Sequence, residues 1–419
     1  KFYQKSLEER KETLLNHPNL SNEAKVLLEK GLVLPESIAN QMVENQIEVY
    51  GLPYGIVPEL IVNEKSYIVP MVTEEPSVIA AASYASKLIN LAGGTTTIQE
   101  KREMIGEIAI VKSSLTLEEV KAKLEQQSES LFTIANNAHP SIVKRGGGIR
   151  EIWVEEKSTD KERFYIFYVS VDTKEAMGAN MLNTILEALV SPIEALTGGE
   201  SIMAILSNLA TNSVVTARCV LSPRILDTRT IKGEDVIDRI VLASEFSKAD
   251  PYRATTHNKG IMNGIDSIVI ATGNDWRAIE AGAHAFASLS GQYQPLTSWT
   301  KDEAGNLVGT ITLPLPVGTV GGSISIHPGA QFAHELLGHP SAIELAGIIA
   351  SIGLAQNLAA VRALVTDGIQ KGHMRLQAKS LGLAVGATEE ELPLLMNLLA
   401  KAPHLNQETA KALLEELRK

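Results

Sequence analysis

Hydrophobic and polar positions follow two patterns along the chain, one with the spacing of a helix and one with that of a strand. Apolar residues three and four apart, often behind a Ser or Thr cap, predict helices. The main predicted helices are Val78–Ala92, the segment after the Thr116 and Glu119 capping box, Ala179–Val190, Asp235–Ala249 and Leu345–Val365. Short apolar runs rich in β-branched residues predict strands. They include Leu60–Val62, Tyr67–Val69, Ile149–Val154, Phe164–Val171, Val214–Leu221 and Ser267–Ala271.

The order of these elements predicts a mixed α+β chain. The first fifty residues are polar and helical in pattern. The segments Thr95–Gln99 and Ile105–Val111 look like a strand pair, and Leu296–Leu313 looks like a β-hairpin. Near the end, a hinge-like region with Gly368 and Gly372 precedes a final helical segment.

Composition narrows the class of protein. A chain of 419 residues allows two to four domains, at roughly 100–200 residues each. The hydrophobic fraction of 44% can bury large cores, and the aromatic fraction of 5% favours helices packed on sheets. A formal net charge of -11 disfavours nucleic acid as a partner. The single cysteine, Cys219, lies in an apolar run, so we expect a core residue in the reducing cytoplasm.

Two uncharged stretches raise the question of a membrane span. Leu345–Val361 is shorter than the ~20 apolar residues that a span needs, and it contains Ser351, Gln356 and Asn357. Leu307–Ala333 is interrupted by prolines and glycines. No N-terminal segment has the charged and then apolar order of a signal peptide. We therefore expect a buried Ala-rich helix at the first stretch and no membrane partner.

Common cofactor and hydrolase motifs do not occur in the sequence. Gly318, Gly321 and Gly322 lack the spacing of the Rossmann fingerprint, and there is no Walker A sequence or G-x-S-x-G elbow. His334 and His339 are five residues apart, whereas a zincin helix needs two His four apart on one face. We therefore predict no metal site and interpret this His pair as the end of a helix.

The segment Glu74-Glu75-Pro76-Ser77 comes between a predicted strand and a predicted helix. An acid there can face a cleft and donate a proton if burial raises its pKa, and Ser77 can bind an anion at the helix start. Acids and Pro are also favoured at helix starts for local reasons alone. By pattern, this second interpretation is the stronger one.

Lys259 and Asp275 form a second candidate group. Lys259 lies among Asn and Gly in His257–Asp266, which we interpret as a tight loop where a fixed cation can stabilise an oxyanion. A lone lysine is more often a solvated surface residue. Asp275 follows the predicted strand Ser267–Ala271 and precedes a helix predicted from Trp276. It can pair with Lys259 or simply cap that helix, and the pattern leaves both open.

Two glycine-containing segments complete the candidates. Glu175–Asn180 joins a predicted strand to a predicted helix, and Gly178 there lets a phosphate approach backbone N–H groups. Such turns are common, so this signal is weak by itself. His373 follows Gly372, and a mobile His can deliver a proton when a flap closes. An exposed loop His is the simpler alternative.

Together, the segments around these residues resemble class II (bacterial-type) HMG-CoA reductase, where HMG-CoA is 3-hydroxy-3-methylglutaryl-coenzyme A. The similarity covers nearly the whole chain in the family's order and spacing, and several matching segments exceed ten residues. They are TEEPSVIAAAS (Thr73–Ser83), RGGG (Arg145–Gly148), EAMGANMLNT (Glu175–Thr184), SNLA (Ser207–Ala210), DPYRATTHNKGIMNGID (Asp250–Asp266), ATGNDWRAIEAGAHAFAS (Ala271–Ser288), GLAQNL (Gly353–Leu358) and GHM (Gly372–Met374).

The resemblance implies roles for individual residues. The catalytic Glu, Lys, Asp and His of the family match Glu75, Lys259, Asp275 and His373. Positions that hold the HMG moiety match Ser77, Arg253, Asn263 and Gln356, with Asn208 in a matching motif nearby. The dinucleotide-binding motif matches Glu175, Met177, Gly178, Ala179 and Asn180. Glu175 replaces the usual Asp, which keeps the charge and lengthens the side chain.

The resemblance also implies a domain plan and an assembly. Residues 1–100 and 212–367 would form a large mixed α/β domain that binds HMG-CoA. Residues 101–211 would form an inserted, smaller ferredoxin-like α+β domain that binds the dinucleotide, and residues 368–419 a C-terminal helical flap. The implied protein is a cytoplasmic homodimer, or a larger assembly of dimers, with its active site at the dimer interface.

The implied reaction consists of two hydride transfers from NAD(P)H, which convert HMG-CoA to mevalonate and free CoA through mevaldehyde. Basic residues near the expected ribose position, His139, Lys144 and Arg145, favour NADPH over NADH. Three rival functions are an oxidoreductase of another substrate on the same scaffold, a CoA-binding protein without activity, and a zinc hydrolase that uses His334 and His339. The four intact catalytic matches argue against the second rival.

Overall fold

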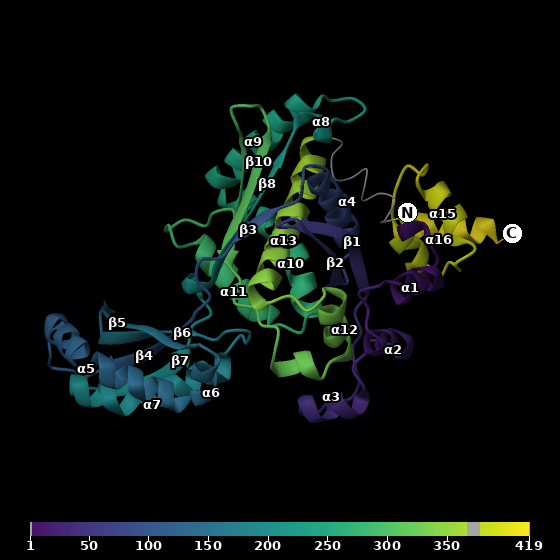
Figure 1. Ribbon diagram of the computed structural model, residues 1–419. Helices are drawn as coiled ribbons and strands as arrows, with labels where there is room; N and C mark the ends of the chain where they lie inside the picture. The colour runs from purple at the N-terminus through teal and green to yellow at the C-terminus, as the bar shows by residue number, and fades with distance from the viewer. Residues whose placement is uncertain (1, 367–377, 419) are drawn as a thin grey trace.

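The structure, a computed structural model, describes residues 2–366 and 378–418 (Figure 1). Helices and strands are mixed along the chain, so the predicted α+β class is confirmed. The elements are η1 Phe2–Gln4, α1 Leu7–Leu15, α2 Asn22–Lys30, α3 Glu36–Met42, β1 Tyr54–Val62, β2 Lys65–Val72, α4 Val78–Leu91, β3 Thr96–Ile98, β4 Met104–Val111, α5 Leu117–Ala138, α6 Pro140–Lys144, β5 Gly148–Ser158, β6 Arg163–Asp172, α7 Ala179–Thr197, β7 Glu200–Leu206, η2 Thr211–Ser213, β8 Val214–Leu221, α8 Pro223–Leu226, α9 Gly233–Ala249, α10 Pro251–Ala271, α11 Trp276–Ala287, β9 Thr297–Lys301, β10 Leu307–Pro314, η3 Gly322–Ser325, α12 Pro328–Leu336, α13 Ala342–Val365, α15 Leu392–Leu399 and α16 Gln407–Leu417.

Helix α13 lies at the centre of the largest hydrophobic core, with α4 and α10 packed against it. Every residue from Leu345 to Leu358 is buried, as expected of a helix that is apolar on all sides. Within the described ranges, α13 is the one helix long and apolar enough to cross a membrane, but 67% of its most apolar stretch is buried inside the protein. The prediction of a buried Ala-rich helix at Leu345–Val361 is therefore confirmed.

A four-stranded antiparallel sheet, in the order β3-β8-β10-β9, shares this core with α13. Its β9–β10 pair is the hairpin predicted over Leu296–Leu313. The fully buried Trp299 of β9 faces Gly309 of β10, and its indole Nε1 donates to Oδ1 of Asn357 at 2.7 Å. This bond ties the sheet to the central helix. Cys219 is buried in β8, as its apolar setting predicts.

A second hydrophobic core lies between Met104 and Ala210, apart from the first. Its sheet is antiparallel, in the order β5-β6-β4-β7, and α5 and α7 cover one face of it at the lower left of Figure 1. Apart from the short α6, the chain order is β-α-β-β-α-β. The chain enters and leaves this unit side by side, since Glu103 N donates to Asn212 O at 3.0 Å.

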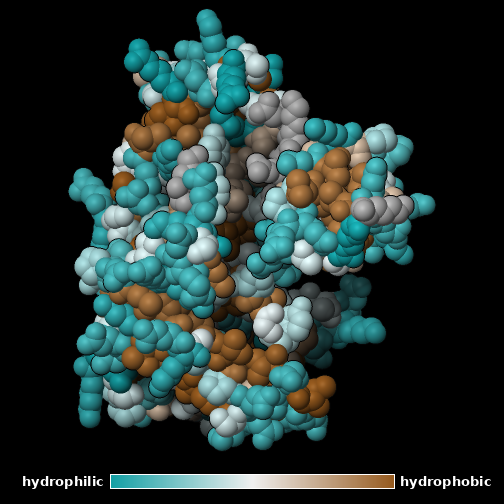
Figure 2. All heavy atoms as spheres, turned by 90° about the vertical axis from the view of Figure 1, so that its right-hand side faces the viewer, coloured by the Kyte–Doolittle hydropathy of each residue, from teal (hydrophilic) through white to brown (hydrophobic). Residues whose placement is uncertain are grey.

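The described C-terminal residues, 378–418, are helical and have a small core of their own around Leu395, Leu399 and Leu414. Figure 2 shows this unit standing out from the body of the molecule, with an apolar patch toward the viewer. Its exposed leucines are Leu383, Leu394 and Leu398. The candidate residues Gly368, Gly372 and His373 lie outside the described residues.

One local prediction is wrong in a way that matters for the site. Ser267–Ala271 is not a strand, and Lys259 is not on a tight loop, because α10 is continuous from Pro251 to Ala271. Of the glycines that suggested a loop, Gly264 has another function here. A Cβ on Gly264 would lie 3.0 Å from Gln356 Cβ, so its absence lets α10 and α13 approach closely.

Two further predictions are wrong in pairing or extent. Thr95–Gln99 and Ile105–Val111 both contain strands, but β3 pairs with β8 whereas β4 pairs with β6 and β7, so they belong to different sheets. Helix α7 does not end at Val190 but continues to Thr197 through Pro192. Ile193 and Leu196 are buried in that extension, which offsets the roughly 3 kcal/mol that proline costs inside a helix.

Gly309→Ala tests the packing of the hairpin on the central helix. A Cβ at this position would lie 2.1 Å from Cζ3 of Trp299, and neither group has room to move. We expect a loss of ~1–3 kcal/mol in stability, the usual cost of overpacking a core, measured by thermal and urea unfolding. The control is Gly51→Ala, where an added Cβ meets nothing within 4 Å. Equal unfolding midpoints for the two variants would contradict the packing described here.

Candidate active site

Glu75 and Lys259 meet although they are far apart in sequence. Lys259 Nζ lies 2.6 Å from Glu75 Oε2, and Asn263 Nδ2 donates to Glu75 Oε1 at 3.4 Å. Lys259 and Asn263 are one turn apart on α10, which places both side chains on the same helix face. The side chains of Lys259 and Glu75 remain 60% and 38% exposed, so a substrate can reach the pair.

Glu75 is presented by a strained turn between β2 and α4. Ser77 is the N-terminal cap residue of α4, yet its backbone is left-handed, with φ of 77°, and its side chain makes no capping bond. A residue other than glycine rarely adopts this conformation, and such strain concentrates at binding and catalytic sites. The Ser77 hydroxyl is thereby left free of the usual helix-capping function, close in sequence to Glu75.

Arg253 and Gln356 extend this surface along α10 and α13. Arg253 lies in the first turn of α10, and partial burial lowers the pKa of its guanidinium. Gln356 is buried on α13 with an Oε1 that has no hydrogen-bond partner, next to Gly264. A cation that is partly removed from water favours an anionic ligand. An amide oxygen without a partner favours a ligand group that donates a hydrogen bond.

Asp275 belongs to a different cluster. It is the N-terminal cap of α11, where its Oδ1 accepts from Ala278 N at 3.0 Å, and the described contacts include no ion pair with Lys259. Of the two alternatives that the pattern left open, the structure has the helix cap. Asp275, Met177 and Asn208 line the same cavity of about 10 Å³. Candidates for catalysis, cofactor binding and substrate binding therefore meet at this point.

The loop before α7 has the form of an anion cradle. Gly178 is the N-terminal cap of α7 with φ of 92°, and a Cβ there would lie 2.4 Å from Thr173. Because glycine offers no side chain, the first N–H groups of α7, from Ala179 and Asn180 onward, receive no capping bond from it. Free N–H groups and the positive end of the helix dipole fit a pyrophosphate.

The side chain of Glu175 faces another element. Its Oε2 accepts from Thr319 Oγ1 at 3.0 Å and from Ala342 N at 2.7 Å. Ala342 is the first residue of α13, where a negative charge is favoured by the helix dipole. The carboxylate thus contacts the central unit, whereas its backbone belongs to the loop before α7.

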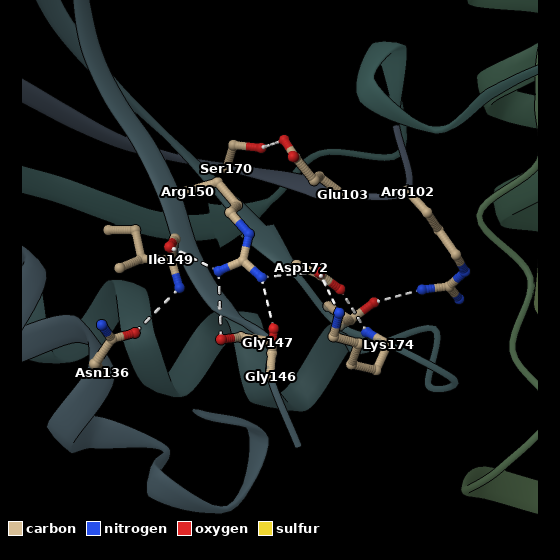
Figure 3. A network of polar contacts seen from close by, with 11 residues as sticks. Arg102, Glu103, Asn136, Gly146, Gly147, Ile149, Arg150, Ser170, Asp172 and Lys174 are labelled. Atoms are coloured by element: carbon tan, nitrogen blue, oxygen red, sulfur yellow. Dashed lines mark hydrogen bonds and ion pairs between the residues drawn. The ribbon is translucent and has the colours of Figure 1, made fainter. Parts of the chain in front are cut away.

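Basic residues gather beside this loop (Figure 3). Arg150 Nη2 donates to Gly146 O at 2.7 Å and to Asp172 Oδ2 at 2.9 Å, and Lys174 Nζ lies 2.9 Å from the same Asp172 oxygen. The hydrogen bonds and charges of this cluster lower the pKa of Asp172, although its burial acts in the opposite direction. Lys144 and Arg145, at the end of α6, are exposed nearby in sequence.

His334 and His339 do not converge. His334 Nε2 lies 3.1 Å from Thr272 O, whereas His339 Nε2 lies 3.0 Å from Glu335 Oε1. Both line a hollow of about 900 Å³ that also borders Glu175. Helix α12 ends at Leu336, so this pair lies at a helix end, as predicted.

Comparison with known proteins decides the family. The model of the family "Hydroxymethylglutaryl-coenzyme A reductase" matches residues 6–378. The chain belongs to this family. The 3-hydroxy-3-methylglutaryl-coenzyme A reductase of Archaeoglobus fulgidus is 42% identical over 418 residues, which is 100% of this chain and 94% of that protein. A probable reductase of Borreliella burgdorferi is 38% identical over 83% of this chain and 78% of its own length.

Solved structures of reductases in this family are similar to this chain over nearly its whole length. A Streptococcus pneumoniae reductase matches with a TM-score of 0.86 at 53% identity, over 100% of this chain and 99% of that one. The class II reductase of the same organism, bound to NADPH in open conformations, matches with a TM-score of 0.84 at 53% identity, over 99% of this chain and 100% of that one. The resemblance to class II HMG-CoA reductases is confirmed.

Sequence reasoning missed several residues that organise this reductase's site. Asn274 exchanges two hydrogen bonds with the backbone of Gly318, at 2.7 and 3.0 Å, directly beside Asp275. Arg102 and Thr319 contact the loop that carries Gly178. No local pattern singles out Arg102 or Thr319. The T-G-N-D sequence before α11 was the one available signal for Asn274.

A half-buried carboxyl pair, Asp266 and Glu280, continues the Lys259–Asn263 face of α10. Asp266 hydrogen-bonds to Glu280 of α11, and Glu280 Oε2 lies 2.5 Å from His284 Nε2. Burial, together with the Glu280 carboxylate, raises the pKa of Asp266 to about 9. Hydrogen bonds from His284 and Asp266 lower the pKa of Glu280 despite its burial. The pair therefore holds one proton at neutral pH.

Asp266→Asn tests this shared proton. Between about pH 4 and about pH 9 the folded state keeps a proton that the unfolded chain has lost, so Asp266 makes stability fall as pH rises through that window. Asparagine imitates the protonated acid and removes this dependence. We expect the stability of the variant relative to wild type to increase with pH, by up to ~1.4 kcal/mol per pH unit, in unfolding measured from pH 5 to 8.5. Parallel profiles for the two proteins would rule out the shared proton.

Proposed function

We propose that this protein is an NADPH-dependent HMG-CoA reductase, which converts HMG-CoA to mevalonate and free CoA through mevaldehyde in isoprenoid biosynthesis. The observation that carries the proposal is the contact of 2.6 Å between the Lys259 ammonium and the Glu75 carboxylate. It unites two segments that match the family's catalytic motifs. The NADPH-bound Streptococcus pneumoniae reductase, at 53% identity, supports the choice of reaction and cofactor.

The proposed domains are a large HMG-CoA-binding domain, residues 1–100 and 212–367, an inserted dinucleotide-binding domain, residues 101–211, and a C-terminal flap, residues 368–419. The separate cores support these bounds. For the inserted domain, the chain order β-α-β-β-α-β and the strand order β5-β6-β4-β7 support a ferredoxin-like fold.

Lys259 stabilises the negative charge that develops on the reduced carbonyl oxygen. A fixed ammonium provides this stabilisation without reorganisation at the moment of reaction. Glu75, in direct contact with Lys259, serves as the acid that supplies a proton to the oxygen of mevaldehyde. Asp275 acts at the cavity that it shares with Met177 and Asn208. One NADPH would supply the hydride for the first reduction, and a second NADPH, bound after release of the oxidised cofactor, would supply the hydride for the second.

His373 protonates the departing CoA thiolate, which prevents the thiolate from attacking the aldehyde again. This assignment comes from the GHM motif, because His373 lies outside the described residues. A histidine suits the task, since its unperturbed pKa of about 6.5 lets it change charge near neutral pH.

Five residues hold the HMG moiety in this proposal. Arg253 pairs with the substrate carboxylate, since a guanidinium can donate two parallel bonds to it. Gln356 and Asn263 offer amide groups, and the unsatisfied Oε1 of Gln356 supports its assignment. Ser77 offers a hydroxyl that is not engaged as a helix cap, and Asn208 lines the cavity beside Asp275.

The dinucleotide is assigned to the loop and first turn of α7, with Glu175, Met177, Gly178, Ala179 and Asn180 as its binding segment. The uncapped backbone N–H groups at the start of α7, after Gly178, support the assignment of a pyrophosphate site there. A preference for NADPH follows from the basic surface of His139, Lys144 and Arg145, because basic groups suit the 2′-phosphate.

We further propose a homodimer, or a larger assembly of dimers, with the active site at the interface. The exposure of Lys259 and Glu75 supports this arrangement, because the pair still needs a cover that excludes water. We expect the protein to be cytoplasmic. The buried free thiol of Cys219 fits a reducing compartment.

Lys259→Ala tests the proposed reaction. We expect kcat for HMG-CoA reduction to fall by at least ~10²–10³-fold, since the developing oxyanion loses its cation. Turnover is followed at the nicotinamide absorbance band. The matched control is Lys248→Ala, which removes an α9 lysine paired with Glu245 at 2.7 Å. Unchanged turnover in Lys259→Ala would refute the mechanism, and wild-type binding of CoA esters without turnover would favour an inactive CoA-binding protein.

The cofactor preference has its own test. Wild-type kcat/KM should be at least tenfold higher with NADPH than with NADH. A double substitution, Lys144→Ala with Arg145→Ala, should lower kcat/KM for NADPH but not for NADH, because NADH lacks the 2′-phosphate. The ratio of the two values should therefore decrease. The control Lys161→Ala removes an exposed charge in the β5–β6 turn of the same domain. A wild-type preference for NADH would contradict the assignment.

A further inference from the structure

The loop before α7 is seated on a segment of the large domain. Ala176 forms a parallel bridge with Val320, and Thr319 N donates to Glu175 O at 2.8 Å. A Cβ on Gly318 would lie 2.6 Å from Met177 N, so only glycine permits this backbone approach. The Glu175–Met177 loop and the segment 317–320 therefore behave as one joint between two separately folded units.

The half-buried Arg102 side chain bonds to both segments of this joint. Its Nη1 donates to Thr173 Oγ1 at 3.0 Å, and its Nη2 donates to Ala176 O at 2.9 Å and to Val317 O. One guanidinium thus bonds to both sides of the joint. In Figure 3 the Arg102 side chain extends toward the residues beside Lys174. Burial lowers the pKa of Arg102, and Glu175 acts in the opposite direction, so the two residues also attract each other.

The Glu175 side chain also bonds across this joint. Its carboxylate accepts from Thr319 Oγ1 and from Ala342 N at the start of α13. A negative charge in this loop would repel a pyrophosphate if it faced the α7 N-terminus. Turned toward a second helix N-terminus, the same charge is stabilised by that helix dipole. It therefore serves as an anchor to the large domain.

The joint continues to a proposed catalytic residue. The Asn274 side chain exchanges two hydrogen bonds with the backbone of Gly318 and donates a third to Thr272 Oγ1, and Asn274 directly precedes Asp275. An unbroken set of contacts thus leads from Gly178, through Met177 and Gly318, to Asp275. It sets the distance between the anion cradle and the proposed site of reduction.

We infer that Arg102 and Glu175 are positioning residues, which clamp the dinucleotide-binding loop to segment 317–320 and so hold the α7 N-terminus in register with Asp275. This inference rests on the proposed function, since it takes the loop to bind NADPH. A clamp is needed because the loop and Asp275 belong to parts of the chain with separate hydrophobic cores. A shift of about 1 Å between reacting groups can cost a hundredfold in rate.

Arg102→Gln, Arg102→Lys and Thr319→Val test the clamp. The matched control is Arg163→Gln, because Arg163 also donates to backbone carbonyls, of Ser113 and Leu115, but within one domain. The first measurement is hydrogen–deuterium exchange of the free protein. We expect faster exchange in residues 173–178 and 317–320 for Arg102→Gln and Thr319→Val, and no change there for Arg163→Gln. This measurement needs no cofactor and no substrate.

The second measurement is NADPH binding by calorimetry, with steady-state kinetics beside it. Arg102→Gln should raise the Kd for NADPH at least tenfold and lower kcat, with the KM for HMG-CoA changed less than twofold. Thr319→Val should raise that Kd about threefold, and Arg102→Lys should recover part of the loss. If Arg102→Gln does not fold, Thr319→Val alone decides the question.

The outcomes separate this inference from the proposed function. Wild-type exchange rates and NADPH affinity in both Arg102→Gln and Thr319→Val would overturn the clamp. A lower melting temperature with unchanged NADPH affinity would also overturn it, because that is the signature of a purely structural arginine. Failure of the wild-type protein to reduce HMG-CoA would instead refute the proposed function, whatever the exchange data show.

Discussion

The ion pair between Lys259 and Glu75 is the contact on which the proposed chemistry depends. Both side chains are substantially exposed, so the pair contributes little to stability. Its geometry must therefore be imposed by the elements that carry it. Helix α10 is held by close packing on α13, where Gly264 lies against Gln356, and Glu75 is held by the strained turn at Ser77. A rigid scaffold thus positions a weak but reactive contact.

The two parts of the chain that contain the two larger hydrophobic cores pose a different physical problem. Each has a complete hydrophobic core, so apolar burial does not by itself determine how they are oriented. Their relative orientation instead depends on directional polar contacts around the loop before α7, which include those of Arg102 and Glu175. Each such contact depends on donor and acceptor geometry. The proposed function therefore depends on directional bonds between the parts that contain these two cores.

The candidate site shows how far residue patterns reach. Taken one segment at a time, patterns favoured the simpler interpretations of Glu75 and Lys259, as a helix-start acid and a solvated lysine. The long family-like segments raised both to catalytic candidates, and the structure brings them together. The pattern misplaced Lys259 on a loop, because a glycine that permits helix packing, such as Gly264, looks in sequence like a glycine that breaks a helix. His373 lies outside the described residues, so its role stays a prediction.

The sequence by itself determined what depends on neighbouring residues. The capping box at Thr116, the hairpin over Leu296–Leu313 and the apolar helix α13 follow from local spacing and apolar pattern. Only the tertiary structure decided which sheet each strand joins and where the side chain of Glu175 is directed. Those outcomes depend on partners far away in the sequence, such as Arg218 opposite Thr96 and Ala342 beside Glu175. No local rule can contain information about them, because the competing partners exist only once the chain has folded.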